Sequence, residues 1–375
     1  MKNVLLYSAL LLMGLALSQV WPALAPATHG TALPVLKFRT MVCLGYLMIQ
    51  VGREFEIDKS NIRQYGWDYV VAATAAAFPW IFTAVYFVFV LGPSGGWATK
   101  DAWVDSLLVA RFSAPTSAGI LFSMLAAAGL AATWVYRKAR VLAIFDDLDT
   151  VLFMIPLKIL VVGMKWQLAA IAVIIFLLLW AAWKHYRRWA LPTSWKWTLA
   201  YAVGLAAVSE AIYVSSKLID EVAPVHLEVL LPAFALGCVM AAGHEETSGD
   251  RRAGGVLTAA FMVLVGLSMP VLVGVGTTGW GSILGHVVAV TVLSNLGKMF
   301  SVFCYRREAT LRERLAVSIG MFPRGEVGAG VLVVSLSYGI GGTAVTVAML
   351  SLALNLVLTG VFIAAVKKLI AKKAP

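Results

Sequence analysis

Charged side chains are scarce in this 375-residue chain. They make up 13% of the residues and hydrophobic side chains 61%, whereas a soluble domain has about 25% charged and 45–50% apolar residues. The apolar residues also come in long blocks, and a membrane-spanning helix needs about 20 mostly apolar residues. The blocks predict a polytopic membrane protein with little room for a soluble domain, which excludes a cytosolic enzyme, a nucleic-acid-binding protein and a fused regulatory module.

Cysteine and histidine are also scarce. The three cysteines (Cys43, Cys238 and Cys304) lie far apart, without a CxxC pair or an even set, which excludes a disulfide framework and a zinc site. The five histidines provide no buried pair for haem, and His286 stands alone near the outer start of its expected span. We therefore expect no cofactor, and no redox enzyme.

Twelve stretches are long and apolar enough to predict membrane-spanning helices, and together they predict an all-α fold. The first resembles a signal peptide, with a small-residue site at 23–25, but Pro26 would hinder cleavage there, so we expect it to stay as a span. Only residues 367–375 follow the last stretch, so no soluble nucleotide-binding domain is expected there. The expected spans are 3–24, 34–52, 66–91, 103–130, 138–163, 166–184, 196–217, 224–243, 253–274, 280–305, 312–338 and 343–366.

The basic residues predict the orientation of these spans. With the N-terminus inside, the segments expected on the inside hold 21 Lys and Arg residues, whereas those expected outside hold only Lys100, Lys165 and Lys217. Cytoplasmic loops collect Lys and Arg, so both termini are expected in the cytoplasm, and the formal net charge of +11 reflects this bias rather than affinity for nucleic acid.

Several ionisable residues within the expected spans lie near span ends. There, long side chains reach the interface by snorkelling, and acids sit in the interface. We expect an interfacial position for Lys37, Arg39, Asp68, Asp105 and Glu228.

Asp146 and Asp147 lie well inside the expected span 138–163. A charge at mid-bilayer costs about 2.5–3.5 kcal/mol on insertion scales, so each acid needs an ion-pair partner, contact with water or a functional role. Adjacent helical residues point about 100° apart, so one carboxylate can meet a fixed cation while the other faces a cavity. Asp149, three residues after Asp146, lies on the same side of the helix as Asp146. Mutual repulsion favours a proton on one of the three acids, which suits a proton-coupled ion site.

Two expected spans carry Pro and Gly beside ionisable residues. The segments are 113–119 (SAPTSAG) and 322–328 (FPRGEVG), with Pro115 and Pro323 at their breaks. Proline removes a backbone donor and glycine weakens a helix, so both spans are predicted to be interrupted. The first runs from outside to inside and the second from inside to outside, as inverted repeats around a central binding site require.

Lys298 is equally deep in the expected span 280–305 and needs a carboxylate partner. Together with the aspartate pair it resembles the bacterial monovalent cation/proton antiporters, in the branch that includes sodium/proton antiporters and potassium/proton efflux systems. The likeness extends from about residue 44 to the end. Its most specific stretch is 320–328 (GMFPRGEVG), and weaker ones are 52–56 (GREFE), 232–237 (PAFALG) and 261–268 (FMVLVGLS).

The resemblance implies a cation and proton site at the crossing of the two interrupted helices. Asp147 would be the main carboxylate that binds Na⁺ or a proton. Asp146 would be its neighbour, paired with Lys298 when no cation is bound. Thr116 and Ser117 would lend oxygens, and unwound carbonyls and water would complete the shell.

The resemblance also implies that Arg324 and Glu326 hold the broken helix and tune access from the cytoplasm. It implies a dimeric scaffold against which the core slides like an elevator. The implied division is 1–65 for scaffold and dimerisation helices one and two, 66–163 for core helices three to five, 164–195 for linker helix six, 196–279 for scaffold and dimerisation helices seven to nine, and 280–375 for core helices ten to twelve with a short basic tail.

The sequence departs from the family at several positions. Arg53 replaces a usual leucine, and the segment with Pro115 has no acid where many relatives carry one. Asp149 and Lys158 are additional charges, and Arg111 has no assigned role. Lys158 lies three helical turns beyond Asp147, where lining the outer passage and neutralising a distant acid, Glu210, both stay open.

Other functions stay open or are excluded on the same residues. Exchange of K⁺ or Li⁺ for protons, and sodium-coupled symport of an organic anion on a related fold, remain alternatives, although the aspartate pair with Lys298 disfavours symport. An intramembrane aspartyl protease places its carboxylates on facing helices, which the adjacent Asp146 and Asp147 cannot do. The expected protein is therefore a sodium/proton antiporter of a bacterial inner membrane, not an enzyme.

Overall fold

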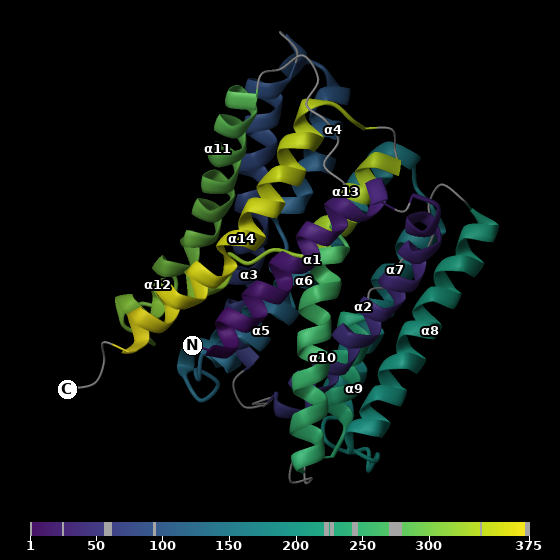
Figure 1. Ribbon diagram of the computed structural model, residues 1–375, viewed down its shortest axis with the longest axis vertical. Coiled ribbons are helices and arrows are strands. Elements are labelled where there is room, and N and C mark those ends of the chain that lie inside the picture. The colour runs from purple at the N-terminus through teal and green to yellow at the C-terminus, as the bar shows by residue number, and fades with distance from the viewer. Residues whose placement is uncertain are drawn as a thin grey trace. The chain divides into compact units, whose positions relative to one another are not determined.

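The computed structural model describes residues 2–24, 26–55, 62–92, 95–220, 225, 229–241, 247–269, 280–337 and 340–371. The regular structure of these residues is helical, and the only β-type contact among them is an isolated bridge between Trp189 and Met240. The α-helices are α1 (Lys2–Leu24), α2 (Pro26–Glu54), α3 (Ile62–Tyr86), α4 (Lys100–Ala110), α5 (Ala118–Ala127), α6 (Trp134–Val162), α7 (Trp166–Lys184), α8 (Trp195–Ile219), α9 (Leu230–Val239), α10 (Ser248–Leu267), α11 (Trp280–Lys298), α12 (Leu311–Gly320), α13 (Glu326–Ser337) and α14 (Thr343–Ala371) (Figure 1).

Short segments of other helix types extend or join these helices. They are the π-helix η1 (Phe87–Leu91) and the 3₁₀-helices η2 (Gly96–Ala98), η3 (Arg111–Ser113) and η4 (Met299–Phe303). Every one of the twelve expected spans contains helix in the described residues, and both predicted interruptions are present: residues 114–117 are non-helical between η3 and α5, and 321–325 between α12 and α13.

The described residues include eight helical spans that are long and apolar enough to cross a membrane. The other four expected spans fall outside that set for visible reasons: α6 and α10 each carry several charges, α9 is short, and α12 and α13 are the two halves of an interrupted span. The structure therefore confirms the all-α, polytopic membrane fold.

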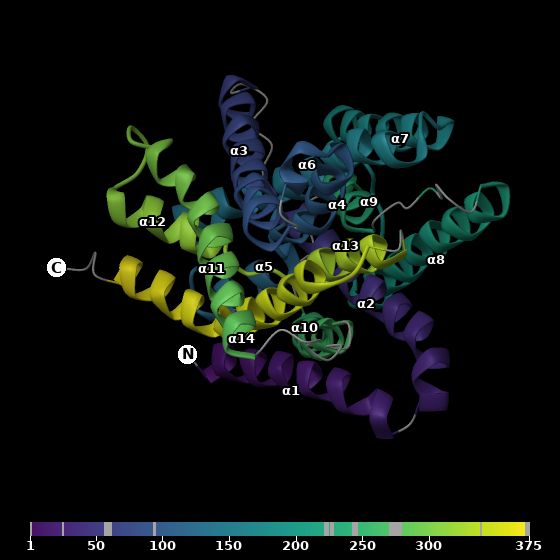
Figure 2. The same cartoon turned by 90° about the horizontal axis from the view of Figure 1, so that it is seen from above.

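One compact unit comprises residues 1–26, 63–157 and 265–375. Within it, α14 packs against α1, α11 and α12 (Figure 2). The buried residues of α14 recur at helical spacing, among them Ala348, Ser351, Asn355 and Thr359, because one face of the helix is turned inward. Small and polar residues on this face allow close packing and bring Asn355 to the interior of the unit.

The second compact unit comprises residues 27–62 and 158–264. In this unit α9 packs on α7 and α8. Lys37 and Glu210 lie 3.8 Å apart between Nζ and Oε2, with 46% and 36% of their side chains exposed. Lys37 keeps the accessible position that was expected for it, and Glu210 has an ion-pair partner other than Lys158.

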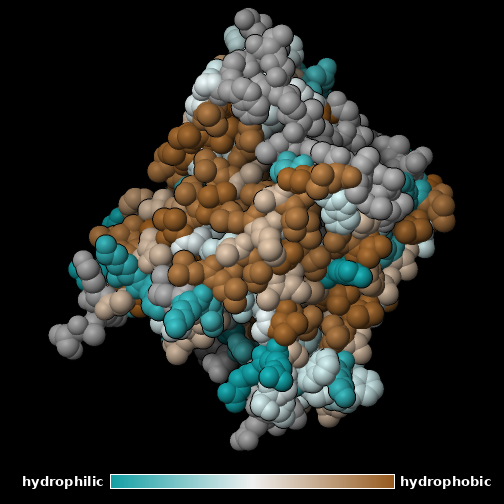
Figure 3. All heavy atoms as spheres, in the orientation of Figure 1, coloured by the Kyte–Doolittle hydropathy of each residue, from teal (hydrophilic) through white to brown (hydrophobic). Residues whose placement is uncertain are grey.

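Hydrophobic side chains cover much of the face shown in Figure 3. Val357 and Val361 of α14 are 46% and 62% exposed, and Phe176 and Leu177 of α7 are 67% and 52% exposed. Apolar exposure of this extent on long helices is expected of surfaces that contact lipid.

Candidate functional site

The two interrupted helices are joined to each other directly at their breaks. The backbone N–H of Ser117 donates to the carbonyl of Pro323 at 2.8 Å, and the Thr116 hydroxyl donates to the carbonyl of Met321 at 3.0 Å. In addition, the Ser117 side chain caps α5 by accepting from the N–H of Ile120 at 3.4 Å. Each break leaves backbone groups without helical partners, and here the opposite break satisfies several of them.

Close approach at this crossing depends on Gly325. A Cβ atom at this position would lie 2.9 Å from Cδ1 of Ile120 and 3.2 Å from Oγ of Ser117. Pro115 and Pro323 both lie in the unwound segments, where their missing N–H groups cost no helical hydrogen bond. The proline and glycine residues of the two segments therefore interrupt the helices, as was predicted from the sequence.

A buried ion pair lies beside the crossing. The ammonium of Lys298 donates to both oxygens of Asp146, at 3.0 and 2.9 Å, and to the carbonyl of Ala114 at 2.6 Å. Asp146 also accepts from the backbone N–H of Thr116 at 2.7 Å. Lys298 and Asp146 have no exposed surface, so the site brings together the end of α11, the middle of α6 and the break before α5.

Gly297 allows Lys298 to reach this position. A Cβ atom at Gly297 would lie 2.4 Å from the nitrogen of Pro79 in α3, so only a glycine permits α11 to approach α3 so closely. Pro79 lacks an N–H, and its ring occupies the space that a side chain at 297 would need.

Asp147 is the next residue on α6, and 6% of its surface is exposed. It lies within electrostatic range of the Lys298 ammonium, as does Asp146. No group of three or more His, Cys, Asp or Glu side chains with metal-binding geometry occurs in the described part of the chain. Hydroxyl and carbonyl oxygens lie at the crossing beside these carboxylates, and oxygen ligands of this kind suit hard cations.

Arg324 is buried in the crossing and is held by uncharged acceptors. Its Nε donates to the carbonyl of Ser113 at 2.7 Å, and its Nη2 to the carbonyl of Ser294 at 3.0 Å. Its Nη1 donates to the side chain of Asn295 at 2.7 Å and to the carbonyl of Phe322 at 3.2 Å. The guanidinium therefore joins both breaks to α11.

Asn295 and Asn355 complete this network, and sequence reasoning assigned neither of them a role. Asn355 accepts from the backbone N–H of Arg324 at 3.0 Å, and its amide donates to Asn295 at 3.2 Å. Each of these amide side chains lies within an apolar helix, and an amide in the membrane needs a hydrogen-bond partner. This was the sequence feature from which a role for Asn295 and Asn355 could have been inferred.

The remaining predicted residues lie at varied distances from this centre. Asp149 and Arg111 have no exposed surface, and Arg111 donates to the carbonyl of Asp149 at 2.9 Å. Lys158 is half-buried on α6, in the part of that helix assigned to the second unit. The backbone of Glu326 begins α13, but its side chain lies outside the described residues, as does Glu228.

Asp68, which was expected near a membrane interface, is enclosed by other side chains. It is 2% exposed, accepts from Lys138 at 2.9 and 3.1 Å and accepts from the hydroxyl of Tyr305 at 2.8 Å. Lys138 lies 3.2 Å from Glu308 as well. A lysine from α6 and a tyrosine beyond η4 thus enclose the carboxylate, and their distance along the sequence conceals these contacts.

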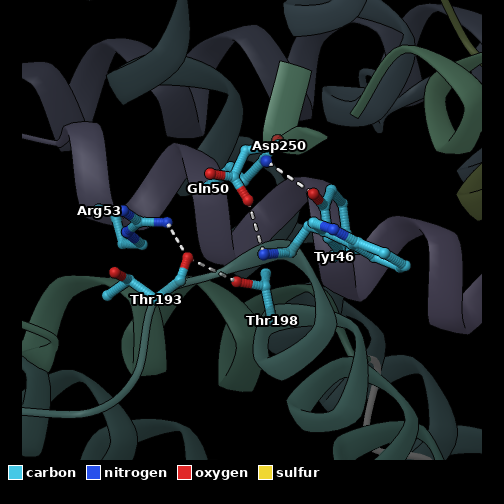
Figure 4. A pocket seen from close by; sticks show the side chains of 7 residues that line it. Tyr46, Gln50, Arg53, Thr193, Thr198 and Asp250 are labelled. Carbon is cyan, nitrogen blue, oxygen red and sulfur yellow. Dashed lines mark hydrogen bonds between the residues drawn. The ribbon is translucent and has the colours of Figure 1, made fainter. Parts of the chain in front are cut away.

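Arg53 lines a small polar pocket in the second unit (Figure 4). Its Nη1 donates to the carbonyl of Thr193 at 3.2 Å. Asp250 accepts from the backbone N–H of Trp195 at 2.8 Å and thereby satisfies a free donor in the first turn of α8. These contacts tie together helix ends within the unit, which gives Arg53 a structural role.

Comparison with known proteins places these features in a family. Residues 6–369 match the family described as "Sodium/hydrogen exchanger, transmembrane", and no curated protein sequence matches the chain. Among solved structures, the sodium proton antiporter MjNhaP1 from Methanocaldococcus jannaschii at pH 8 is 16% identical, with a TM-score of 0.57 over 96% of this chain and 92% of that chain. At this identity the likeness concerns the fold, which agrees with the interrupted and crossing helices. Because the family match spans nearly the whole sequence, the chain belongs to the sodium/hydrogen exchanger family of membrane transporters.

Proposed function

We propose that this protein exchanges Na⁺ for protons across a bacterial inner membrane, with both termini in the cytoplasm. The observation that carries the proposal is the fully buried Asp146–Lys298 ion pair, adjacent to Asp147 and seated where two interrupted helices meet. Buried ionisable groups in a membrane are costly and mark ion or proton pathways. Family membership supports exchange of a cation for protons.

Competition for Asp147 accounts for exchange in this proposal. Asp147 binds either a proton or Na⁺, and the site does not cross the membrane with its carboxylates bare. Thr116 and Ser117 lie at the crossing, next to the carboxylates, and they contribute oxygens to the bound cation. Their present hydrogen bonds to the opposite break fix the positions of those oxygens.

Lys298 makes the exchange electrogenic in this proposal. A cation that reaches Asp146 breaks the ion pair, and the freed ammonium releases a second proton. Two protons then move for each Na⁺, so that one net charge crosses per cycle. The membrane potential contributes about 2.3 kcal/mol per net charge per 100 mV, which drives the exchange at ordinary resting potentials.

The proposed alternating access is of the elevator type. Core residues 66–163 and 280–375 slide against a dimeric scaffold formed by residues 1–65 and 196–279, with 164–195 as linker. The hydrogen bonds of Arg324, Thr116 and Ser117 join the two breaks, which supports movement of the crossing as one body. Arg324 and Glu326 control access from the cytoplasm, with Arg324 supported by its contacts in both breaks.

The test is proton movement in proteoliposomes that contain a pH-sensitive dye. Addition of Na⁺ should move protons with the wild type and not with Asp147→Asn. Asp105→Asn is the matched control, because Asp105 is exposed on α4 and lies outside the site. Na⁺-dependent exchange that survives in Asp147→Asn would remove this carboxylate from the centre of the mechanism.

Cation titrations in the same vesicles decide between the ions. Exchange with K⁺ in place of Na⁺ would make the protein a potassium/proton antiporter, and Li⁺ is tested alongside. Uptake of Na⁺ that requires an organic anion and moves no protons would instead indicate symport. A rate that responds to an imposed potential supports unequal charge exchange, and a rate independent of potential contradicts it.

A further inference from the structure

Arg111 is a buried cation that the proposed mechanism does not use. It begins η3, directly before the first break, and has no exposed surface. Its guanidinium carbon lies 4.9 Å from the ring centre of Trp80 and 5.5 Å from that of Phe153. Among the described residues, its only hydrogen bond is from Nη2 to the carbonyl of Asp149, and Nε and Nη1 have no partner.

Asp149 is the matching buried anion. It lies two residues after Asp147 on α6 and has no exposed surface. The groups in electrostatic range of its carboxylate are Tyr69, Asp146, Arg111 and Lys298. Arg111 donates to the backbone carbonyl of Asp149 and is absent from the ion pairs within 4 Å in the described part of the chain, and both Asp146 and Asp149 lie within electrostatic range of its charge.

Three buried carboxyl groups and three buried basic side chains therefore share this core. Lys298 neutralises Asp146 through direct hydrogen bonds, and Arg324 is held by neutral oxygens across the crossing. Asp149 and Arg111 are left as a negative and a positive charge beside the cation site. Asp147 and Asp149 are two residues apart on a helix, so their carboxylates lie within about 10 Å of each other. At this distance, and in an effective dielectric constant of about 20, one unit charge changes the affinity of a site for a cation on the order of ten-fold.

We propose that Arg111 and Asp149 are opposed fixed charges that set the cation affinity of the Asp146–Asp147 site. Asp149 deepens the negative potential there and Arg111 reduces it, so that the site releases its cation as readily as it binds it. This inference rests on the proposed function, since it concerns the affinity of the same site. Neither residue touches the cation, and both act by position.

A purely structural role is the alternative explanation. Arg111 connects η3 to Trp80 of α3 and to Phe153 of α6, and the Trp80 ring is held by its own hydrogen bond to the carbonyl of Leu107 at 2.8 Å. If the residue only held these helices together, removal of its charge would impair folding and rate without a directed change in affinity. The two explanations therefore differ in whether the affinity for Na⁺ changes in a defined direction.

The experiment measures the apparent KM for Na⁺ in proteoliposomes at alkaline pH, where protons compete least. The variants are Arg111→Gln, Asp149→Asn and the double variant. Arg111→Gln should lower KM, Asp149→Asn should raise it, each on the order of ten-fold, and the double variant should return close to the wild type. Arg111→Lys and Asp149→Glu keep the charges and should move KM less than the neutral variants do.

Every result of this experiment either supports or contradicts the proposed roles of Arg111 and Asp149. Single variants that shift KM in the same direction or leave it unchanged, or a double variant worse than both, would overturn the inference. If Arg111→Gln does not fold, Asp149→Asn against Asp149→Glu decides alone, and an unchanged KM contradicts it. A wild type that exchanges neither Na⁺ nor K⁺ would refute the proposed function itself, whereas wild-type exchange with unmoved variants refutes only this inference.

Discussion

Substitution of Lys298 by glutamine should destabilise the protein strongly. The ammonium donates three hydrogen bonds of 2.6 to 3.0 Å, two of them to Asp146. Its loss leaves a fully buried carboxylate with the N–H of Thr116 as its described donor. Breaking one partner of a buried ion pair costs about 3–5 kcal/mol. Asp146→Asn combined with Lys298→Gln should recover most of this loss, because two neutral amides leave no uncompensated charge.

Thermal unfolding in detergent, with and without Na⁺, measures the effect. If Na⁺ and the ammonium compete for Asp146, then Na⁺ should stabilise Lys298→Gln more than the wild type, by up to about 2.7 kcal/mol at 100 times the dissociation constant. Lys217→Gln is the matched control, because Lys217 is exposed on α8 and a surface change falls within about 0.5 kcal/mol. The reasoning is refuted if Lys298→Gln unfolds at the same temperature as Lys217→Gln, or if the double variant is less stable than Lys298→Gln alone.

Three further predictions concern the surroundings of this pair. Gly297→Ala should destabilise by about 1–3 kcal/mol through overpacking against Pro79, whereas Gly285→Ala on the same helix has open space and should not; equal melting temperatures would contradict this. Asn355→Ala should cost about 1–3 kcal/mol by leaving buried partners unsatisfied, and a wild-type melting curve would refute the network. Tyr305→Phe should cost about 1–3 kcal/mol, because it removes the hydroxyl that donates to the buried carboxylate of Asp68 at 2.8 Å; a melting temperature equal to that of the wild type would contradict this contact.

The sequence contained enough information for the helices and for both breaks. Apolar length predicts a spanning helix directly, and Pro115 and Pro323 act on the backbone at their own positions, so these features are local. The opposed orientation of the two breaks indicated an inverted pair, whereas their crossing was expected only from the resemblance. The contact of Lys298 with Asp146 was expected from the resemblance, and the structure brings the two residues together.

The partners of Arg324, Arg111 and Asp68 could not be predicted in the same way. Each depends on how helices distant in sequence pack: Asp68 meets Tyr305 across 237 positions, and Arg324 meets Ser113 across 211. Charge and burial indicate that a partner must exist, but several acceptors satisfy that requirement equally well. Only packing selects neutral carbonyls and amides for Arg324, and this selection is a property of the whole fold.

The ammonium of Lys298 has one further consequence. It donates hydrogen bonds to the carbonyl of Ala114, in the first break, and to both oxygens of Asp146. The lysine side chain attaches it covalently to the protein at this position. A tethered group competes at an effective concentration in the millimolar range or above, independent of the solution outside. If a cation binds at Asp146 as proposed, the transporter contains its own competitive inhibitor, and an incoming ion must be abundant enough to displace it. Affinity for the transported ion is then adjusted by how easily one side chain withdraws, without any change in the ligands themselves.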